Sequence, residues 1–212
     1  MKFFKKFNKG LILTVIVITL LIVHLVNIEA KRSAEKPEIE KCAKEYIVFV
    51  NKFAVLPEEY QKIYTKIKND DEANEIDKKL DSAIEEQLSK FEEEMKTKFI
   101  DNKTARDLQK NVLGTIISSN NDFKKSVMTK YEREITKIKK YEFDEDQVTI
   151  TFDSNIEIET KYIENRKEKT KKNNQKAEDE SITLKFEDGA WKVVYADLRV
   201  QPNAVTEMFG MF

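Results

Sequence analysis

A long apolar run near the N-terminus constrains this chain more than any other feature. Residues 11–26 read LILTVIVITLLIVHLV, and thirteen of these sixteen residues are Leu, Ile or Val. With Asn27 and Ile28, the run approaches the roughly 17–25 residues that a helix needs to cross a bilayer. At about −0.3 to −0.6 kcal/mol for each aliphatic residue, insertion is favoured by on the order of −4 to −8 kcal/mol. We therefore expect a single-pass transmembrane anchor from Leu11 to Ile28.

Positive charge ahead of this run predicts its orientation. Four lysines lie among residues 1–10, and such residues stay on the cytoplasmic side of a membrane. Residues 1–10 are then a basic cytoplasmic tail, and the chain after residue 28 lies outside the cytoplasm at the cell membrane. The alternative is a signal peptide cleaved near Ala30, after which the remainder is secreted. We favour the uncleaved anchor, because the apolar run exceeds a usual signal core and Glu29 adjoins the cleavage position.

The rest of the chain has the size and composition of one folded domain, which we assign to residues 33–200. Gly and Pro are few, at four and three, and the whole chain has a net charge of −1. Residues 1–32 carry six basic residues against one acidic residue, which leaves the remainder at net −6. An acidic domain is poorly suited to nucleic acid, so no nucleic-acid partner is expected. Lys far outnumbers Arg, which is typical of A/T-rich bacterial genomes.

Apolar residues recur every three or four positions over residues 37–130, which predicts a helical half. Pro37 suits a first helical position, and Pro57 predicts a bend at 54–57 before a second turn pattern that reaches Ile67. Asn69-Asp70-Asp71 predicts the start of a helix over about 71–100.

A further helix is expected over about 104–130 with Thr104 as its N-cap. The polar run at 118–121 interrupts this helix before Phe123, Val127 and Met128.

The period changes from 3.6 to 2 near Tyr131, which predicts a sheet half over 131–200. A first, bulged strand is expected at 131–143, a turn at 144–146, and a long strand with one buried face at 148–162. Residues 164–180 are almost wholly polar, and we interpret them as a solvated hairpin loop. The alternative is a basic finger that contacts acidic polymers or lipid headgroups through Arg166, Lys167, Lys169, Lys171, Lys172 and Lys176.

Asp188-Gly189 predicts a two-residue type I′ hairpin turn. This turn pairs Phe186 with Trp191, Leu184 with Val193 and Ile182 with Tyr195, so that all six apolar side chains share one face. The apolar parity then shifts to Ala196, Leu198 and Val200, which predicts a bulge near Asp197. Residues 201–212 form an apolar tail that either enters the core or stays as an exposed patch.

Helices followed by a four-stranded antiparallel meander resemble NTF2-like (cystatin-like) domains. The resemblance is carried by the F-x-D-G-x-W-K-V-V motif and covers about residues 131–200. It implies an α+β fold in which helices pack on a curved four-stranded antiparallel sheet. Tethered bacterial domains of this plan include VirB8-like conjugation components. The matched residues are Phe186, Asp188, Gly189, Trp191, Lys192, Val193 and Val194.

No residue pattern in the chain indicates catalysis, and we expect no catalytic, cofactor-binding or metal-binding residue. The only histidine, His24, lies in the apolar run, and the only cysteine, Cys42, lies on an apolar helical stripe as a buried small hydrophobe. Asp197 is the best of weak carboxylate candidates, and Trp191 is expected in the core.

We therefore expect a non-enzymatic protein-interaction or assembly subunit of a bacterial envelope system, related to conjugation or secretion. The alternatives are an NTF2-like small-ligand pocket and a carboxylate-based hydrolase. The partner, the ligand and the oligomeric state are not determined by the sequence.

Overall fold

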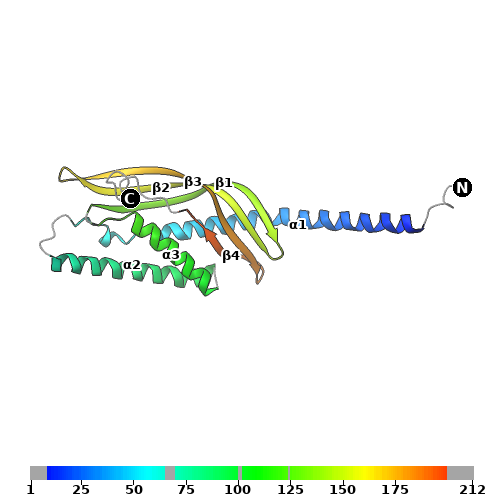
Figure 1. Cartoon of the computed structure of the whole chain (residues 1–212), viewed down its shortest axis with the longest axis horizontal. Helices are drawn as coiled ribbons and strands as arrows, with labels where there is room; N and C mark the ends of the chain where they lie inside the picture. Colours follow the sequence, from blue (N-terminus) through cyan, green and yellow to red (C-terminus); the bar gives the residue numbers. More distant parts are fainter. Residues whose placement is uncertain (1–8, 65–69, 100–101, 124, 200–212) are drawn as a thin grey trace. The chain divides into compact units, whose positions relative to one another are not determined.

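The computed structural model describes residues 9–64, 70–99, 102–123 and 125–199, with side chains from Leu13 onward. The chain divides into two compact units, residues 1–40 and residues 41–212. The predicted α+β class is confirmed: a long N-terminal helix with an apolar first half is followed by further helices and one open, four-stranded antiparallel sheet (Figure 1). The predicted tail at 201–212 lies outside the described residues.

The N-terminal helix α1 runs without a break from Lys9 to Ala54, with Pro37 in its interior. The prediction that Pro37 begins a separate helix is therefore wrong. A proline inside a helix removes one backbone hydrogen bond, but residues 30–36 (AKRSAEK) are mostly good helix formers that favour continuation. The predicted bend at 54–57 is confirmed, because α1 ends at Ala54.

Beyond this bend, the described residues up to 64 contain one helical turn, the 3-10 helix η2 (Glu58–Tyr60). The predicted longer turn pattern is wrong over residues 61–64, and Ile67 lies outside the described residues. The carbonyl groups at the end of α1 are satisfied from elsewhere, because Gln87 Nε2 donates to both Phe53 O and Val55 O at 2.7 Å. A side chain from the next helix therefore ends α1.

The second helix, α2, spans Asp70–Lys98, close to the prediction, and it buries Leu80, Ala83, Phe91 and Met95. The third, α3, spans Lys103–Ser119, and its N-cap is Asn102 instead of the predicted Thr104. The helix ends within the polar run at 118–121, where the amides of Asn120 and Asn121 donate to Ile116 O and Ile117 O.

The sheet contains β1 (Ser126–Asp144), β2 (Gln147–Glu164), β3 (Lys167–Glu187) and β4 (Ala190–Asp197) in that spatial order. It begins five residues earlier than predicted, so Val127 and Met128 lie on a strand and not on a helix. The predicted bulging of β1 is confirmed, because its register with β2 shifts three times. Its alternating pattern is irregular for this reason.

The most extensive correction concerns residues 164–180, which do not form a loop. Only Asn165 and Arg166 turn the chain, both with positive φ, and Lys167 already pairs with Glu164. Ion pairs across the strands hold this polar segment in the sheet: Lys172 contacts Glu159 at 2.6 Å, and Lys169 contacts Glu164. Cross-strand charges therefore replace the apolar alternation that identifies most strands.

The β3–β4 hairpin has the predicted turn at Asp188-Gly189 and two of the three predicted pairs. Phe186 pairs with Trp191 and Leu184 with Val193, but Tyr195 pairs with Thr183 instead of Ile182. The bulge lies at Val194, three residues before the predicted position, so Ala196 takes the buried place and Tyr195 is 43% exposed. An earlier bulge changes the face of every residue after it.

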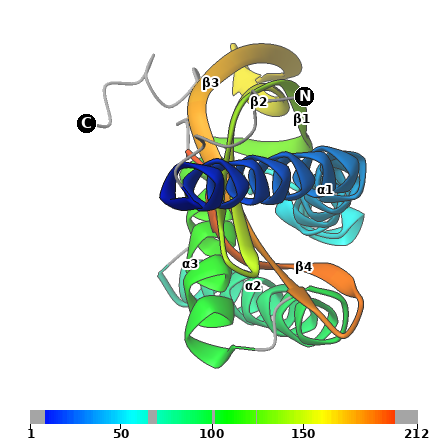
Figure 2. The same cartoon turned by 90° about the vertical axis from the view of Figure 1, so that its right-hand side faces the viewer.

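Residues 41–54 of α1 pack between the sheet and the pair α2 and α3 (Figure 2). The ring of Phe49 stacks on Phe91 of α2 with centroids 4.9 Å apart. Tyr46 donates a 2.7 Å hydrogen bond to Gln109 of α3, and Gln109 in turn donates to Ala196 O of β4 at 3.0 Å. These buried links join three elements that are distant in sequence into one core.

Candidate functional site

The first half of α1 exposes the largest apolar surface in the described part of the chain. Large aliphatic side chains from Leu13 to Val26 are between 48% and 65% exposed. Thr19 Oγ1 donates back to Val15 O at 2.8 Å, which satisfies its hydroxyl within the helix. This part of α1 is long enough and apolar enough to cross a membrane, and His24 lies within it. Such a surface is unfavourable in water unless lipid or protein covers it.

The single cysteine is held as an inert thiol. Cys42 is half-buried, and its Sγ donates to Trp191 O at 3.2 Å. Burial, with a smaller contribution from the charge of Glu45, raises the pKa of Cys42 to about 11. Because the thiolate is the reactive form, Cys42 is not a nucleophile near neutral pH. The thiol is less buried than predicted, although its role as a small packed side chain agrees with the prediction.

Asp197 and Trp191, the two other candidates from the sequence, lie apart from any chemical constellation. Asp197 is exposed at the end of β4, opposite Ser181. Trp191 is half-buried and packs edge-on against Phe186, which is 43% exposed. The prediction that Trp191 lies in the core is therefore wrong, because its pair with Phe186 lies next to the hairpin turn where the sheet ends.

A buried ion pair is the most unusual polar feature of the fold, and sequence reasoning missed it. Arg133 Nη1 on β1 lies 3.2 Å from Glu180 Oε1 on β3, and the two side chains are 1% and 0% exposed. Ser154 Oγ on β2 donates to Glu180 Oε2 at 2.5 Å. The pair also binds the chain after β4, because Arg199 N donates to Glu180 Oε1 and Arg133 Nη2 donates to Arg199 O.

The alternation of side chains between the two faces of a strand could have indicated the ion pair. Arg133 shares its face of β1 with Tyr131, and Glu180 shares its face of β3 with Ile182. A bulge helps to place Glu180: Asp179 has a positive φ, so both Ala177 and Glu180 are buried although they are three residues apart. Glu180 is the one buried carboxylate among the described residues, and no substrate can reach it.

The inner face of the sheet is filled by side chains. Phe152 and Ile150 are fully buried and Ile156 is 1% exposed. A hollow of about 620 Å³ lies elsewhere, at the surface between α3 and the β3–β4 hairpin, and its lining includes Leu108, Lys185 and Lys192. The space beneath the sheet therefore resembles a packed core and not a ligand cavity.

Acidic side chains line a second hollow of about 500 Å³ on the outer face of the sheet, including Glu132, Glu134 and Glu157. Lys130 lies 2.8 Å from Glu132 and 2.6 Å from Glu157. The hydrogen bond from Lys130 lowers the pKa of Glu157. A general acid needs a raised pKa, so this arrangement does not favour carboxylate catalysis.

No protein-family model and no curated protein matches this sequence. Residue roles therefore rest on the geometry alone, and at the coarse level the arrangement of helices on a four-stranded antiparallel sheet is compatible with an NTF2-like fold.

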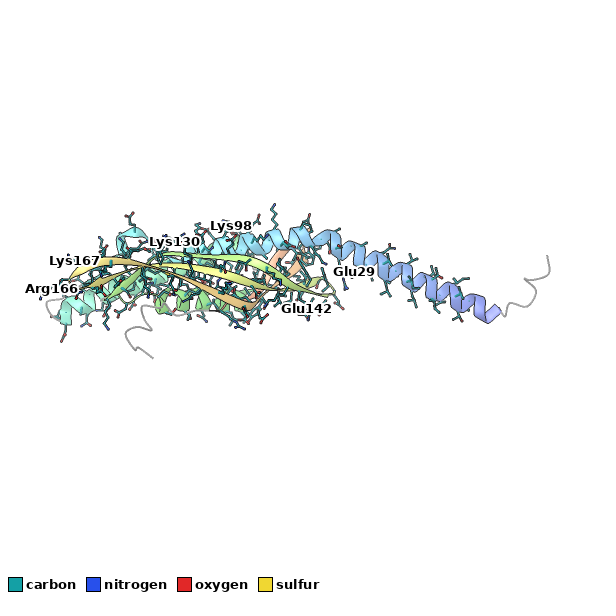
Figure 3. All side chains as sticks on the ribbon, turned by 90° about the horizontal axis from the view of Figure 1, so that it is seen from above. Glu29, Lys98, Lys130, Glu142, Arg166 and Lys167 are labelled. Carbon is teal, nitrogen blue, oxygen red and sulfur yellow. The ribbon has the colours of Figure 1, made fainter. Side chains whose placement is uncertain are left out.

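The outer half of the β2–β3 hairpin is the main charged projection of the second unit. Figure 3 shows Arg166 and Lys167 at one end of the sheet and Glu142 toward the other. Residues 155–177 carry seven basic and four acidic side chains, a net charge of +3. The other residues of the second unit carry more acidic than basic side chains. We call residues 155–177 the basic arm.

Proposed function

We propose that this protein is a membrane-anchored subunit whose C-terminal unit, residues 41–212, binds other proteins outside the cytoplasm. The observation that carries the proposal is the exposed apolar stretch of α1. The side chains from Leu13 to Val26 are about half exposed or more, and the lysines that precede them in the sequence favour a cytoplasmic N-terminus. A bilayer is the environment that removes this surface from water.

Membrane insertion is tested by placing charge in the apolar stretch. Val17→Lys with Leu20→Lys makes the free energy of membrane insertion about 5–7 kcal/mol less favourable. This change is comparable to the whole favourable insertion free energy of the apolar run. We expect the double variant to be released from membranes by alkaline carbonate, whereas the native chain stays in the pellet. Val48→Lys is the matched control, because Val48 lies on the same helix and is 67% exposed but is outside the apolar stretch.

Orientation and processing need separate measurements. Protease added to intact cells, after removal of any cell wall, digests residues 41–212 if the orientation is as proposed. N-terminal sequencing of the membrane-bound protein then distinguishes the anchor from cleavage near Ala30. A C-terminal unit that stays intact in intact cells but is digested after lysis contradicts the proposed topology.

A binding role is supported by the chemistry of the second unit. Among the described residues, Arg133 neutralises its one buried carboxylate, Glu180. The thiol of Cys42 is protonated, and the inner face of the sheet is filled by side chains. The feature of this unit that favours binding is its exposed surface, above all the basic arm. In addition, the coarse resemblance to NTF2-like domains of VirB8-like plan favours an assembly role in a bacterial envelope system.

The protein-binding role is tested by photo-crosslinking in intact cells. A photoreactive residue is placed in turn at Asn174 on the basic arm, at Leu108 on α3 and at Glu134 on the outer face. We expect the same partner to be captured reproducibly from at least one position. Repeated failure at all three positions, with normal expression and membrane location, contradicts the proposal.

A further inference from the structure

The strand β3 is much longer than its neighbour β4, so one of its edges is only partly covered. Strand β4 pairs with Ser181–Glu187, and pairing on this side stops there within the described part of the chain. On its other side, β3 pairs with β2 without a register shift from Lys167 to Ala177. These eleven residues form a regular strand whose second edge has no partner strand among the described residues, and we call this edge the β3 edge.

An open edge presents unpaired backbone groups to any extended chain. In an antiparallel strand every second residue directs its N–H and C=O away from its partner, so about half of the eleven residues do so here. The edge therefore offers a row of hydrogen-bonding groups that a further strand would satisfy.

The opposite edge of the sheet, on β1, is less suited to receive a strand. Three register shifts interrupt β1, and bulges twist an edge away from regular pairing. At Arg133 the edge is already occupied, because Asn51 Nδ2 donates to Arg133 O at 2.8 Å and Arg133 N donates to Asn51 Oδ1 at 3.0 Å. The regular, open edge is the one on β3.

Charge identifies the kind of strand that fits. The β3 edge carries five lysines and one glutamate, a net charge of +4. Glutamates of β2 neutralise some of this charge, through the contacts of Lys172 with Glu159 and of Lys169 with Glu164. A second copy of the same edge would bring lysine against lysine, which disfavours self-pairing. An acidic strand is the complementary occupant.

We propose that the β3 edge binds an acidic, extended segment of a partner protein, which adds a fifth strand to the sheet. The backbone groups of β3 supply the hydrogen bonds, and the lysines select acidic side chains on the added strand. This inference rests on the proposed protein-binding role and specifies where the partner binds and what chemistry it presents.

The test is hydrogen exchange on the full chain in non-ionic detergent, with a ten-residue peptide of alternating Glu and Thr as the probe. We expect about half of the amides in Lys167–Ala177 to gain protection from exchange when the peptide binds. A peptide of alternating Lys and Thr should give no protection. Binding of the acidic peptide should also weaken as salt increases, because exposed charges are screened.

Matched charge reversals locate the effect. Lys167→Glu with Lys176→Glu on the β3 edge should raise the Kd of the acidic peptide by at least about tenfold. Lys137→Glu with Lys140→Glu, on β1 toward the other end of the sheet, should leave the Kd unchanged. Neither variant changes the contacts of Lys169 with Glu164 and of Lys172 with Glu159, which join β3 to β2, so weaker peptide binding does not arise from loss of these contacts.

Three results would overturn the proposal. These are no protection of the β3 amides, protection confined to another strand, and equal binding of the basic and acidic peptides. If phosphatidylglycerol vesicles protect these amides and the acidic peptide does not, the first of these results assigns the lysines to lipid headgroups. If crosslinking from Leu108 or Glu134 captures a partner while the peptide test fails, only the β3 edge is excluded and the proposed function stands.

Discussion

Arg133 and Glu180 form an ion pair of 3.2 Å inside the sheet, and both side chains are withdrawn from solvent. Removing one partner leaves a buried charge without compensation. We expect Arg133→Met to lower the free energy of unfolding by about 3–5 kcal/mol, and Arg133→Met with Glu180→Leu to recover much of this loss. Urea unfolding of the full chain in detergent, followed by Trp191 fluorescence, measures both.

The partly exposed ion pair between Lys139 and Asp153, at 2.6 Å, provides the comparison for this experiment. Lys139→Met should change the stability much less than Arg133→Met, because water screens an exposed pair. Equal losses for the two variants would show that the buried pair has no special importance.

Two glycines should respond in opposite directions to replacement by alanine. Gly189 has a φ of +81°, so Gly189→Ala should destabilise the protein by about 1 kcal/mol through backbone strain. Gly114 lies inside α3, where an added Cβ would meet Leu88 Cδ1 at 3.5 Å, an ordinary contact. Gly114→Ala should therefore stabilise the protein by about 0.5–1 kcal/mol, measured by the same unfolding curves. A loss of stability at Gly114 would contradict the described packing of α2 against α3.

The N-cap of α3 distinguishes two neighbouring polar residues. Asn102 Oδ1 accepts a 3.1 Å hydrogen bond from Ala105 N, whereas Thr104 lies in the first turn. Asn102→Ala should reduce the free energy of unfolding by about 1 kcal/mol, and Thr104→Ala should have little effect. The reverse order would restore the assignment made from the sequence.

Alkylation of Cys42 should be slow and strongly pH-dependent. The pKa of the thiol is raised to about 11 from an ordinary value of 9.0, so about a hundredfold less thiolate is present between pH 7 and 8. The rate with iodoacetamide should rise about tenfold for each pH unit until the pH approaches 11. The same chain in denaturant is the control, and a plateau near pH 9 in the folded protein would show an ordinary thiol.

Local patterns were sufficient for several parts of the fold. The type I′ turn at Asp188-Gly189, the helix now defined as Asp70–Lys98 and the alternation of β2 all follow from interactions within a few residues. Predictions failed where a distant contact or a competing local preference decided the outcome. Thus Val127 and Met128 fit a helical stripe equally well, but pairing with β2 places them on a strand.

The candidate site was less accessible to sequence reasoning than the fold. The net positive charge of residues 164–176 was visible, but its polar composition indicated a loop. The polar part of β3 pairs with β2 along its whole length, and Lys169 and Lys172 contact glutamates there, but the composition of β3 does not reveal this neighbour. The open edge became visible only when the lengths of β3 and β4 could be compared.

The sequence by itself determined the apolar helical stretch, the change from helical to strand periodicity, and the absence of histidine chemistry after residue 24. These properties depend on residue type and local spacing. Tertiary structure alone decided that Arg133 neutralises Glu180, that the polar residues 167–177 join the sheet, and that β4 pairs only with Ser181–Glu187 of the much longer β3. All three depend on which strands become neighbours, and charge complementarity between strands acts only after the chain has brought them together.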